Sequence, residues 1–230
     1  MRMKWTGLLV AALAVGAAGR LTAQGQGWAV TPFVGYSLPL TNYVEPNNPS
    51  CCLTVEKGGG VLVGLTGELS LSKQFAVSGF VSSTVGLSQH ATWDYSLLGA
   101  GEFVLGAATN QLGATFVIRP LGRLPNGAPK VFFVEAGAAL TQFRFSEVED
   151  RSGGGTASPS WNANTTHAVF GGGLTFRIGP RSTLVLFGRY NMALSEYESD
   201  GLTDWNLIPP PDVGQKVNIL TMGVGLRTGR

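Results

Sequence analysis

Residues 61–71 read Val-Leu-Val-Gly-Leu-Thr-Gly-Glu-Leu-Ser-Leu and carry the clearest structural signal in the chain. One face carries Val61, Val63, Leu65, Leu69 and Leu71, and the other carries Gly64, Thr66, Glu68 and Ser70. A period of two residues is typical of a β-strand with one apolar and one polar face. The sequence therefore predicts a strand here, with only one face in an apolar environment.

The same alternation recurs in seven further stretches, and the connections between them are alternately long and short. The stretches cover about residues 28–38, 75–87, 112–119, 132–141, 165–177, 183–192 and 220–227. An even number of strands with every long connection on one side is the arrangement of an outer-membrane barrel. We therefore predict an all-β fold, an eight-stranded antiparallel up-and-down transmembrane β-barrel. Within the second long connection, Gly99 to Ala107 could extend a hairpin above the membrane.

The composition agrees with a barrel that faces lipid. Only 13% of the 230 residues are charged, about half the fraction of an ordinary soluble domain. After the N-terminal segment, no apolar run is long enough for a transmembrane helix. An outer surface in contact with lipid has no use for charged side chains, which explains their scarcity.

The N-terminus has the pattern of an export signal. Two basic residues lie within Met1–Lys4, an apolar run covers Gly7–Ala18, and Leu21-Thr22-Ala23 offers a small residue for cleavage. We expect residues 1–23 to be a signal peptide and residues 24–230 to form one outer-membrane barrel domain. Cleavage turns the formal charge of +2 slightly negative, so no basic patch indicates nucleic-acid binding. The expected location is the bacterial outer membrane.

Alternation also assigns side chains to the lipid and to the lumen. The stretch beginning at Phe75 is expected to face lipid with Val77, Val81, Val85 and Leu87. Aromatic residues at two levels could form interfacial girdles: Trp28, Phe75 and Phe176 at one, Tyr36, Phe145 and Tyr190 at the other. A slip of one residue would reverse such an assignment.

Charged residues fall on the inward side of several strands. They are Glu68, Arg119, Glu135, Arg177, Arg189 and Arg227. Lone charges in a low dielectric are costly, so they should pair across the lumen or reach water. The interior of an eight-stranded barrel is filled by side chains. We interpret these residues as a structural lumen charge network rather than as a path for ions or protons.

The pattern resembles the small eight-stranded outer-membrane barrels of the OmpA/OmpX type. The resemblance covers Trp28 to Arg227, and the segments that carry it are Thr31–Tyr36, Phe187–Asn191 and Met222–Leu226. It implies an outer-membrane protein in contact with lipid and lipopolysaccharide. The sequence ends Arg227-Thr228-Gly229-Arg230, whereas members of that family usually end on an aromatic residue.

The chain offers few candidates for a site of reaction or binding. Some small outer-membrane barrels modify lipids with His, Ser and an acid near the rim; here the candidates would be His90 beside Ser88, and His167, with Glu102 or Glu147. No signature flanks either histidine, and we predict no catalytic residue.

Two acidic sets could offer oxygen ligands to a metal ion, and two glycine runs could suggest a phosphate site. The acidic sets Glu147, Glu149 and Asp150, or Asp200 and Asp204, lack an EF-hand spacing. The Gly58–Gly60 and Gly171–Gly173 runs lack the setting of a phosphate cradle. We predict no cofactor-binding and no metal site.

The sequence contains two cysteines, both in the first long connection. Cys51 and Cys52 are adjacent and could close a vicinal disulfide, or each could pair elsewhere.

The long connections carry aromatic residues suited to a partner surface or glycan: Tyr43, Trp93, Tyr95, Trp161, Tyr197 and Trp205. The predicted function is a non-enzymatic, monomeric outer-membrane barrel with a structural or surface-interaction role through four long extracellular loops. The alternatives are a rim lipid hydrolase or acyltransferase, and a narrow conduit for small solutes. A soluble ligand-binding barrel of the lipocalin kind is the rival fold.

Overall fold

The computed structural model describes residues 27–42, 53–95, 99–123, 131–150, 155–157, 161–179, 182–196 and 216–229. The strands are β1 (Trp28–Pro39), β2 (Leu53–Gly58), β3 (Gly60–Ser70), β4 (Phe75–Tyr95), β5 (Gly99–Ile118), β6 (Phe132–Asp150), β7 (Gly155–Ala157), β8 (Trp161–Arg177), β9 (Ser182–Ala193) and β10 (Ile219–Gly229). The expected signal peptide, Cys51 and Cys52 lie outside the described residues.

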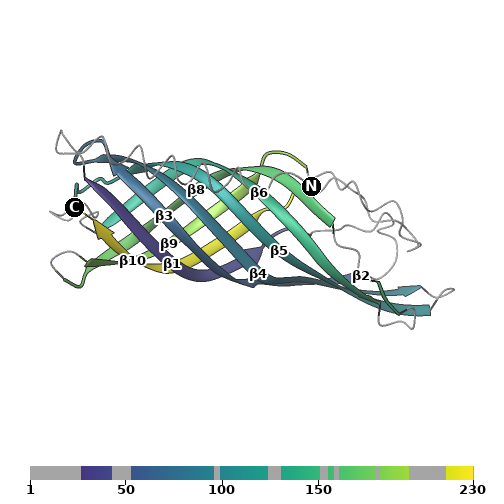
Figure 1. Ribbon diagram of the computed structural model, residues 1–230. Helices are drawn as coiled ribbons and strands as arrows, with labels where there is room; N and C mark the ends of the chain where they lie inside the picture. Colours follow the sequence, from purple (N-terminus) through teal and green to yellow (C-terminus); the bar gives the residue numbers. More distant parts are fainter. Residues whose placement is uncertain are drawn as a thin grey trace.

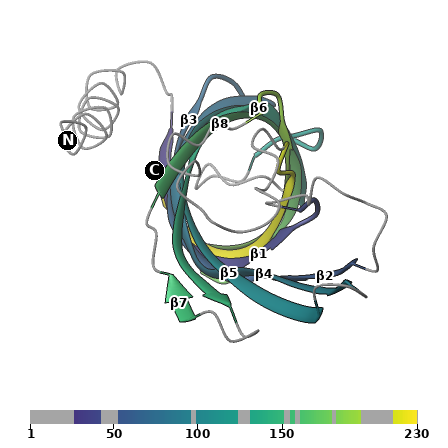
Figure 2. The same cartoon turned by 90° about the vertical axis from the view of Figure 1, so that its right-hand side faces the viewer.

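The strands close into a barrel. Their order is β4-β3-β1-β10-β9-β8-β6-β5, every pair is antiparallel, and the pairing of β4 with β5 joins the two ends. The ring therefore has eight strands, seen nearly end on in Figure 2. β2 continues the line of β3 along β4, and β7 pairs with β6. The predicted eight-stranded antiparallel barrel is confirmed.

The two ends of the barrel differ. At one end, here the turn end, residues 71–74, 119–131 and 178–181 connect β3 to β4, β5 to β6 and β8 to β9. At the other, here the loop end, β4 and β5 run on past the barrel as a paired ribbon (Figure 1). Pairing continues to Tyr95↔Gly99, so the expected extension of this hairpin by Gly99–Ala107 is confirmed.

A belt of apolar side chains covers the outside of the barrel. Exposed members include Val34, Tyr36, Val61, Val63, Leu65, Val77, Val81, Phe116, Val134, Leu140, Phe170, Leu174, Leu186, Met222, Val224 and Leu226. They come from every strand of the ring, and monomeric soluble proteins rarely expose contiguous apolar patches of this kind. The belt matches the lipid-facing band of a membrane barrel. In the part of the chain that the structure describes, no helix is long and apolar enough to cross a membrane.

Two expected outward side chains instead lie inside. Leu87 and Phe145 are each only 1% exposed and pack in one buried cluster. For Leu87 the reason is a register shift between Thr84 and Leu87, where β4 carries an extra residue. Such a bulge reverses the inward and outward phase beyond it. Phe145 shares the inward phase of Phe143, so its assignment to the outer girdle was wrong.

The bulge contains a glycine with a left-handed backbone, Gly86 (φ +80°). No atom lies within 4 Å of a Cβ built on Gly86, and the same holds for Gly67 in β3, whose φ is ordinary. We expect Gly86→Val to lower the free energy of unfolding by about 2 kcal/mol because branched side chains disfavour positive φ. Gly67→Val, with equal space and strand geometry, should be neutral. Urea unfolding in detergent micelles measures both; equal loss in the two variants would contradict the backbone explanation.

Candidate functional site in the barrel lumen

The turn end of the lumen holds a carboxylate between two guanidinium groups. Arg227 on β10 donates from Nη1 to Glu68 Oε2 (2.9 Å) and from Nη2 to Oε1 (2.6 Å). Arg119, which follows β5, donates from Nη2 to the same Oε1 and from Nη1 to Ser70 Oγ (3.2 Å). The side chains of Arg119 and Glu68 are only 0% and 7% exposed. One carboxylate on β3 therefore connects strands across the barrel.

A second ion pair lies deeper in the lumen. Arg189 on β9 donates from Nε to Glu135 Oε1 on β6 (2.7 Å) and from Nη2 to Oε2 (3.4 Å). Thr115 Oγ1 donates to Glu135 Oε2 (2.8 Å). Gly171 on β8 leaves room for this pair, because a Cβ there would meet Arg189 Cγ at 2.9 Å.

Aromatic rings surround the Arg189 guanidinium. Its Cζ lies 4.3 Å from the ring centre of Phe80, 5.0 Å from that of Phe187 and 5.9 Å from that of Phe33. A cation over a ring face is attracted by the quadrupole of the ring, most strongly when water is excluded. The second pair is thus held by its carboxylate on one side and by aromatic faces around it.

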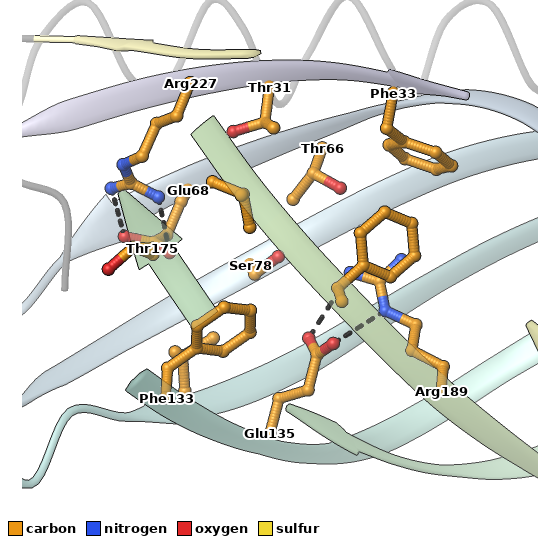
Figure 3. Close-up of a pocket in the computed structure, with 13 residues that line it drawn as sticks. Thr31, Phe33, Thr66, Glu68, Ser78, Phe133, Glu135, Thr175, Arg189 and Arg227 are labelled. Atoms are coloured by element: carbon orange, nitrogen blue, oxygen red, sulfur yellow. Dashed lines mark hydrogen bonds and ion pairs between the residues drawn. The ribbon is translucent and has the colours of Figure 1, made fainter. Parts of the chain in front are cut away.

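Between the two ion pairs lies a cavity of about 40 Å³. Figure 3 shows Glu68 with Arg227 on one side of it and Glu135 with Arg189 on the other. Ser78 lines the cavity, and its buried hydroxyl has no hydrogen-bond partner among the described residues. A water molecule needs roughly 10–15 Å³ by this measure, so the cavity has room for a few waters and not for an organic substrate.

A layer of neutral polar side chains follows toward the loop end. Gln111 Nε2 donates to Thr141 Oγ1 (3.0 Å) and lies 3.1 Å from Asn191 Oδ1. His167 Nε2 lies 2.8 Å from the carbonyl oxygen of Val217, and Thr141 Oγ1 lies 2.9 Å from His167 Nδ1. A carbonyl only accepts, so the neutral imidazole carries its proton on Nε2 and accepts from Thr141 at Nδ1.

Apolar side chains close the lumen above this layer. The cluster consists of Leu87, Leu105, Ala107, Phe143, Phe145, Ala163, Val217 and Ile219, each no more than 4% exposed. It draws on β4, β5, β6, β8 and β10 at the loop end. From the turn end upward, the described lumen thus contains an ion-pair layer, a small cavity, a second ion pair, a polar layer and an apolar plug.

The structure brings five of the six expected lumen charges into these two ion-paired groups. Arg177 is different: it ends β8 at the turn end with an exposed side chain, and its Nε donates to the carbonyl of Gly179 (3.2 Å). Sequence reasoning missed Gln111 and Asn191, although both share the inward phase of the charged residues. Polar side chains on that phase are the signal that would have found them.

The histidines do not form a catalytic group in the described residues. His167 is fully buried between Thr141 and the Val217 carbonyl, with no acid among these partners. His90 lies opposite Glu56 in the pairing of β2 with β4. The described residues contain no group of three or more His, Cys, Asp or Glu placed to hold a metal ion. The side chains of Glu102, Glu147, Glu149 and Asp150, and all of Asp200 and Asp204, lie outside what the structure describes.

Solved structures share this architecture. A major outer membrane protein from Thermus thermophilus aligns with a TM-score of 0.54 and 12% identity, covering 89% of this chain and 99% of that one. OprG from Pseudomonas aeruginosa aligns with a TM-score of 0.52 and 11% identity, covering 87% and 95%. This chain is an eight-stranded β-barrel of the outer-membrane type. No protein-family model and no curated protein sequence matches it.

The outer-membrane barrel fold and the apolar belt together locate the protein. A closed barrel satisfies the backbone hydrogen bonds that lipid cannot satisfy, and the exposed belt supplies the lipid-facing surface. The protein is therefore a bacterial outer-membrane barrel. At 11% and 12% identity the likeness extends to the fold alone, so the activity has to be inferred from the barrel itself.

Proposed function

We propose that this outer-membrane barrel is a non-enzymatic, closed, monomeric scaffold that holds a β-sheet above the membrane for contact with a partner surface. The observation that carries the proposal is the extension of strands past the barrel at the loop end. β4 pairs with β5 from Leu87↔Ala107 to Tyr95↔Gly99, β2 adds to the free side of β4, and β6 and β7 follow on β5. Figures 1 and 2 show this extension leaving the barrel on one side.

The extension is long enough to present a surface. At about 3.4 Å per residue, the nine residues from Leu87 to Tyr95 span roughly 30 Å along β4. We call the combined extension, β2 with the loop-end parts of β4, β5 and β6 and with β7, the outer sheet. Its edges are β2 and β7, and edge strands with free backbone groups can pair with another chain. The barrel ring itself has no free edge, which favours a monomer in the membrane.

The filled lumen argues against a solute conduit. Both ion pairs are buried, and the apolar plug separates the polar layer from the loop end. In planar bilayers we expect the purified protein to add no steps of ionic current. A persistent current that disappears on substitution of Arg189 or Glu68 would contradict the closed barrel and support the conduit.

A rim lipid hydrolase is not favoured by any described contact. Nucleophilic catalysis needs a nucleophile, a base and an orienting group within reach of each other and of substrate. His167 is fully buried and has no access to lipid, and the half-buried His90 lies opposite Glu56 in the strand pairing. We therefore rank enzymatic activity below the scaffold.

The outer sheet can be tested by removing it from an intact barrel. Residues 91–103, which pair within the β4–β5 extension, would be replaced by an Asn-Gly turn, so that Leu105 of the apolar plug is kept. Cells lacking the native protein would make either the full chain or the trimmed chain. For each chain, a difference in gel mobility between unboiled and boiled samples would show that the barrel has formed. Two properties are measured for each strain: adhesion, both between cells and to surfaces, and sensitivity to detergent.

We expect the trimmed barrel to restore detergent resistance but to lose adhesion at least several-fold. That outcome would assign the surface role to the outer sheet and the membrane role to the barrel. Full adhesion with the trimmed chain would refute the surface role. If neither chain changes adhesion or detergent resistance relative to cells that lack the protein, the scaffold role is refuted as well.

A further inference from the structure

Acidic residues are concentrated at the loop end of the barrel, whereas basic residues lie at both ends. In the sequence, all but two of the 14 acidic residues fall in the loop-end connections or in the strand extensions beside them. The exceptions, Glu68 and Glu135, are paired inside the lumen. The turn-end connections, residues 71–74, 119–131 and 178–181, contain no Asp or Glu and carry Lys73, Arg119, Arg123, Lys130 and Arg181.

The structure places a cation at each of the three turns. Lys73 is exposed at the tip of the β3–β4 turn, where Ser72 Oγ accepts from the backbone N–H groups of Gln74 (3.1 Å) and Phe75 (3.0 Å). Arg123 is half-buried in the β5–β6 turn, and Arg177 is exposed where β8 enters its turn. Three separate connections therefore bring positive charge to the same end of the barrel.

Each of these cations has exposed apolar neighbours. Leu121 near Arg123 is 52% exposed and Ile178 beside Arg177 is 60% exposed, while Leu71 and Phe75 flank Lys73. The stacked rings of Phe75 and Phe116 lie at the same end, with centroids 5.6 Å apart. Apolar side chains beside long basic ones are typical of the boundary between acyl chains and head groups. This boundary is where the phosphates of lipid lie.

The acid at this end of the described barrel is already neutralised. Glu68 accepts from both Arg119 and Arg227 inside the lumen, so these three side chains together keep one net positive charge. Lys73, Arg123 and Arg177 add to that charge. Guanidinium and ammonium groups form short, strong hydrogen bonds with phosphate oxygens.

We propose that the turn end is a binding ring for anionic phospholipids, which contacts their phosphate groups in the periplasmic leaflet through Lys73, Arg123 and Arg177. The ring holds a shell of negative lipid around one end of the barrel. It also fixes the orientation of the barrel, because the acidic loop end is repelled by the same lipids. The inference is independent of the role proposed for the outer sheet.

The expected strength is modest for each cation and cumulative. A basic residue near an anionic membrane surface favours binding about five-fold at physiological salt. Screening weakens the effect as the Debye length falls from about 10 Å at 0.1 M salt to about 3 Å at 1 M. Lipid selection by the ring should therefore be strong at low salt and nearly absent at 1 M.

The test compares lipids retained by the full protein. The barrel is reconstituted into vesicles of equal parts phosphatidylglycerol and phosphatidylcholine with matched acyl chains, extracted in mild detergent, and examined by native mass spectrometry. A turn-end variant carries Lys73→Gln, Arg123→Gln and Arg177→Gln. A matched loop-end variant carries Lys57→Gln, Arg144→Gln and Lys216→Gln and loses the same charge.

We expect the unmodified chain to retain phosphatidylglycerol about five-fold or more over phosphatidylcholine. The turn-end variant should fall to the bulk ratio, and the loop-end variant should keep the preference. A salt series on the unmodified chain needs no variant, so it tests the ring even if the turn-end variant does not insert. Equal retention of both lipids by the unmodified chain, equal effects of the two variants, or displacement of the lipid by millimolar inorganic phosphate would overturn the proposal.

Discussion

Glu68→Gln is expected to destabilise the barrel by about 3–5 kcal/mol, the range for breaking a buried ion pair by removing one partner. The carboxylate faces two guanidinium groups, those of Arg119 and Arg227, which are 0% and 6% exposed. A neutral amide keeps the shape but leaves both positive charges without a counter-charge in the lumen. Because these arginines come from separate parts of the chain, the loss should loosen the closure of the barrel at its turn end.

Urea unfolding in detergent micelles, followed by tryptophan fluorescence, measures this change. Glu56→Gln is the matched control, since Glu56 is an exposed residue on β2 and should change stability by less than about 0.5 kcal/mol. If the two variants unfold at the same urea concentration, the turn-end ion pairs contribute nothing to stability and the lumen interpretation fails there.

The second large effect is expected at the deeper ion pair. Glu135→Gln should cost about 3 kcal/mol, because Arg189 would remain charged in the lumen, where it is 6% exposed. The double variant Glu135→Gln with Arg189→Met should recover most of that loss. Methionine is apolar and flexible, and it would lie among the rings of Phe33, Phe80 and Phe187 that now surround the guanidinium.

The four proteins of this double-mutant cycle would be compared by the same urea unfolding. Recovery in the double variant would show that Glu135 is needed mainly to compensate Arg189. If the double variant is less stable than either single variant, Glu135 and Arg189 stabilise the barrel through contacts besides their charge pairing. The hydrogen bond from Thr115 to Glu135 Oε2 (2.8 Å) is then the next contact to test.

The strands and their faces were largely predictable because lipid exposure imposes a period of two residues. Val61, Val63 and Leu65 are outside, whereas Thr66 and Glu68 are on the lumen side, as alternation predicts. The rule failed at Leu87, where both Val85 and Leu87 are apolar and nothing local marks the extra residue except a glycine. Bulge positions depend on the pairing of neighbouring strands, which a single stretch of sequence does not contain.

For the candidate site in the lumen, the sequence predicted which residues face inward but not which of them pair. Alternation alone placed Glu68, Glu135, Arg119, Arg189 and Arg227 on the inward face. It could not say that Glu68 meets partners 51 and 159 positions away, because strand tilt and register set the height of each residue in the lumen. The same reason explains Arg177, whose phase is inward but whose place at the end of β8 leaves it exposed at the turn end.

Local patterns were enough to predict a membrane barrel, since a two-residue period, alternating connection lengths and scarce charge are local or additive properties of the chain. What fills that barrel depends on the folded ring. The contact of His167 with the Val217 carbonyl, the aromatic surroundings of Arg189 and the apolar plug join residues from separate segments of the chain. Their contacts require the closure of the ring, and closure is a property of all eight strands together.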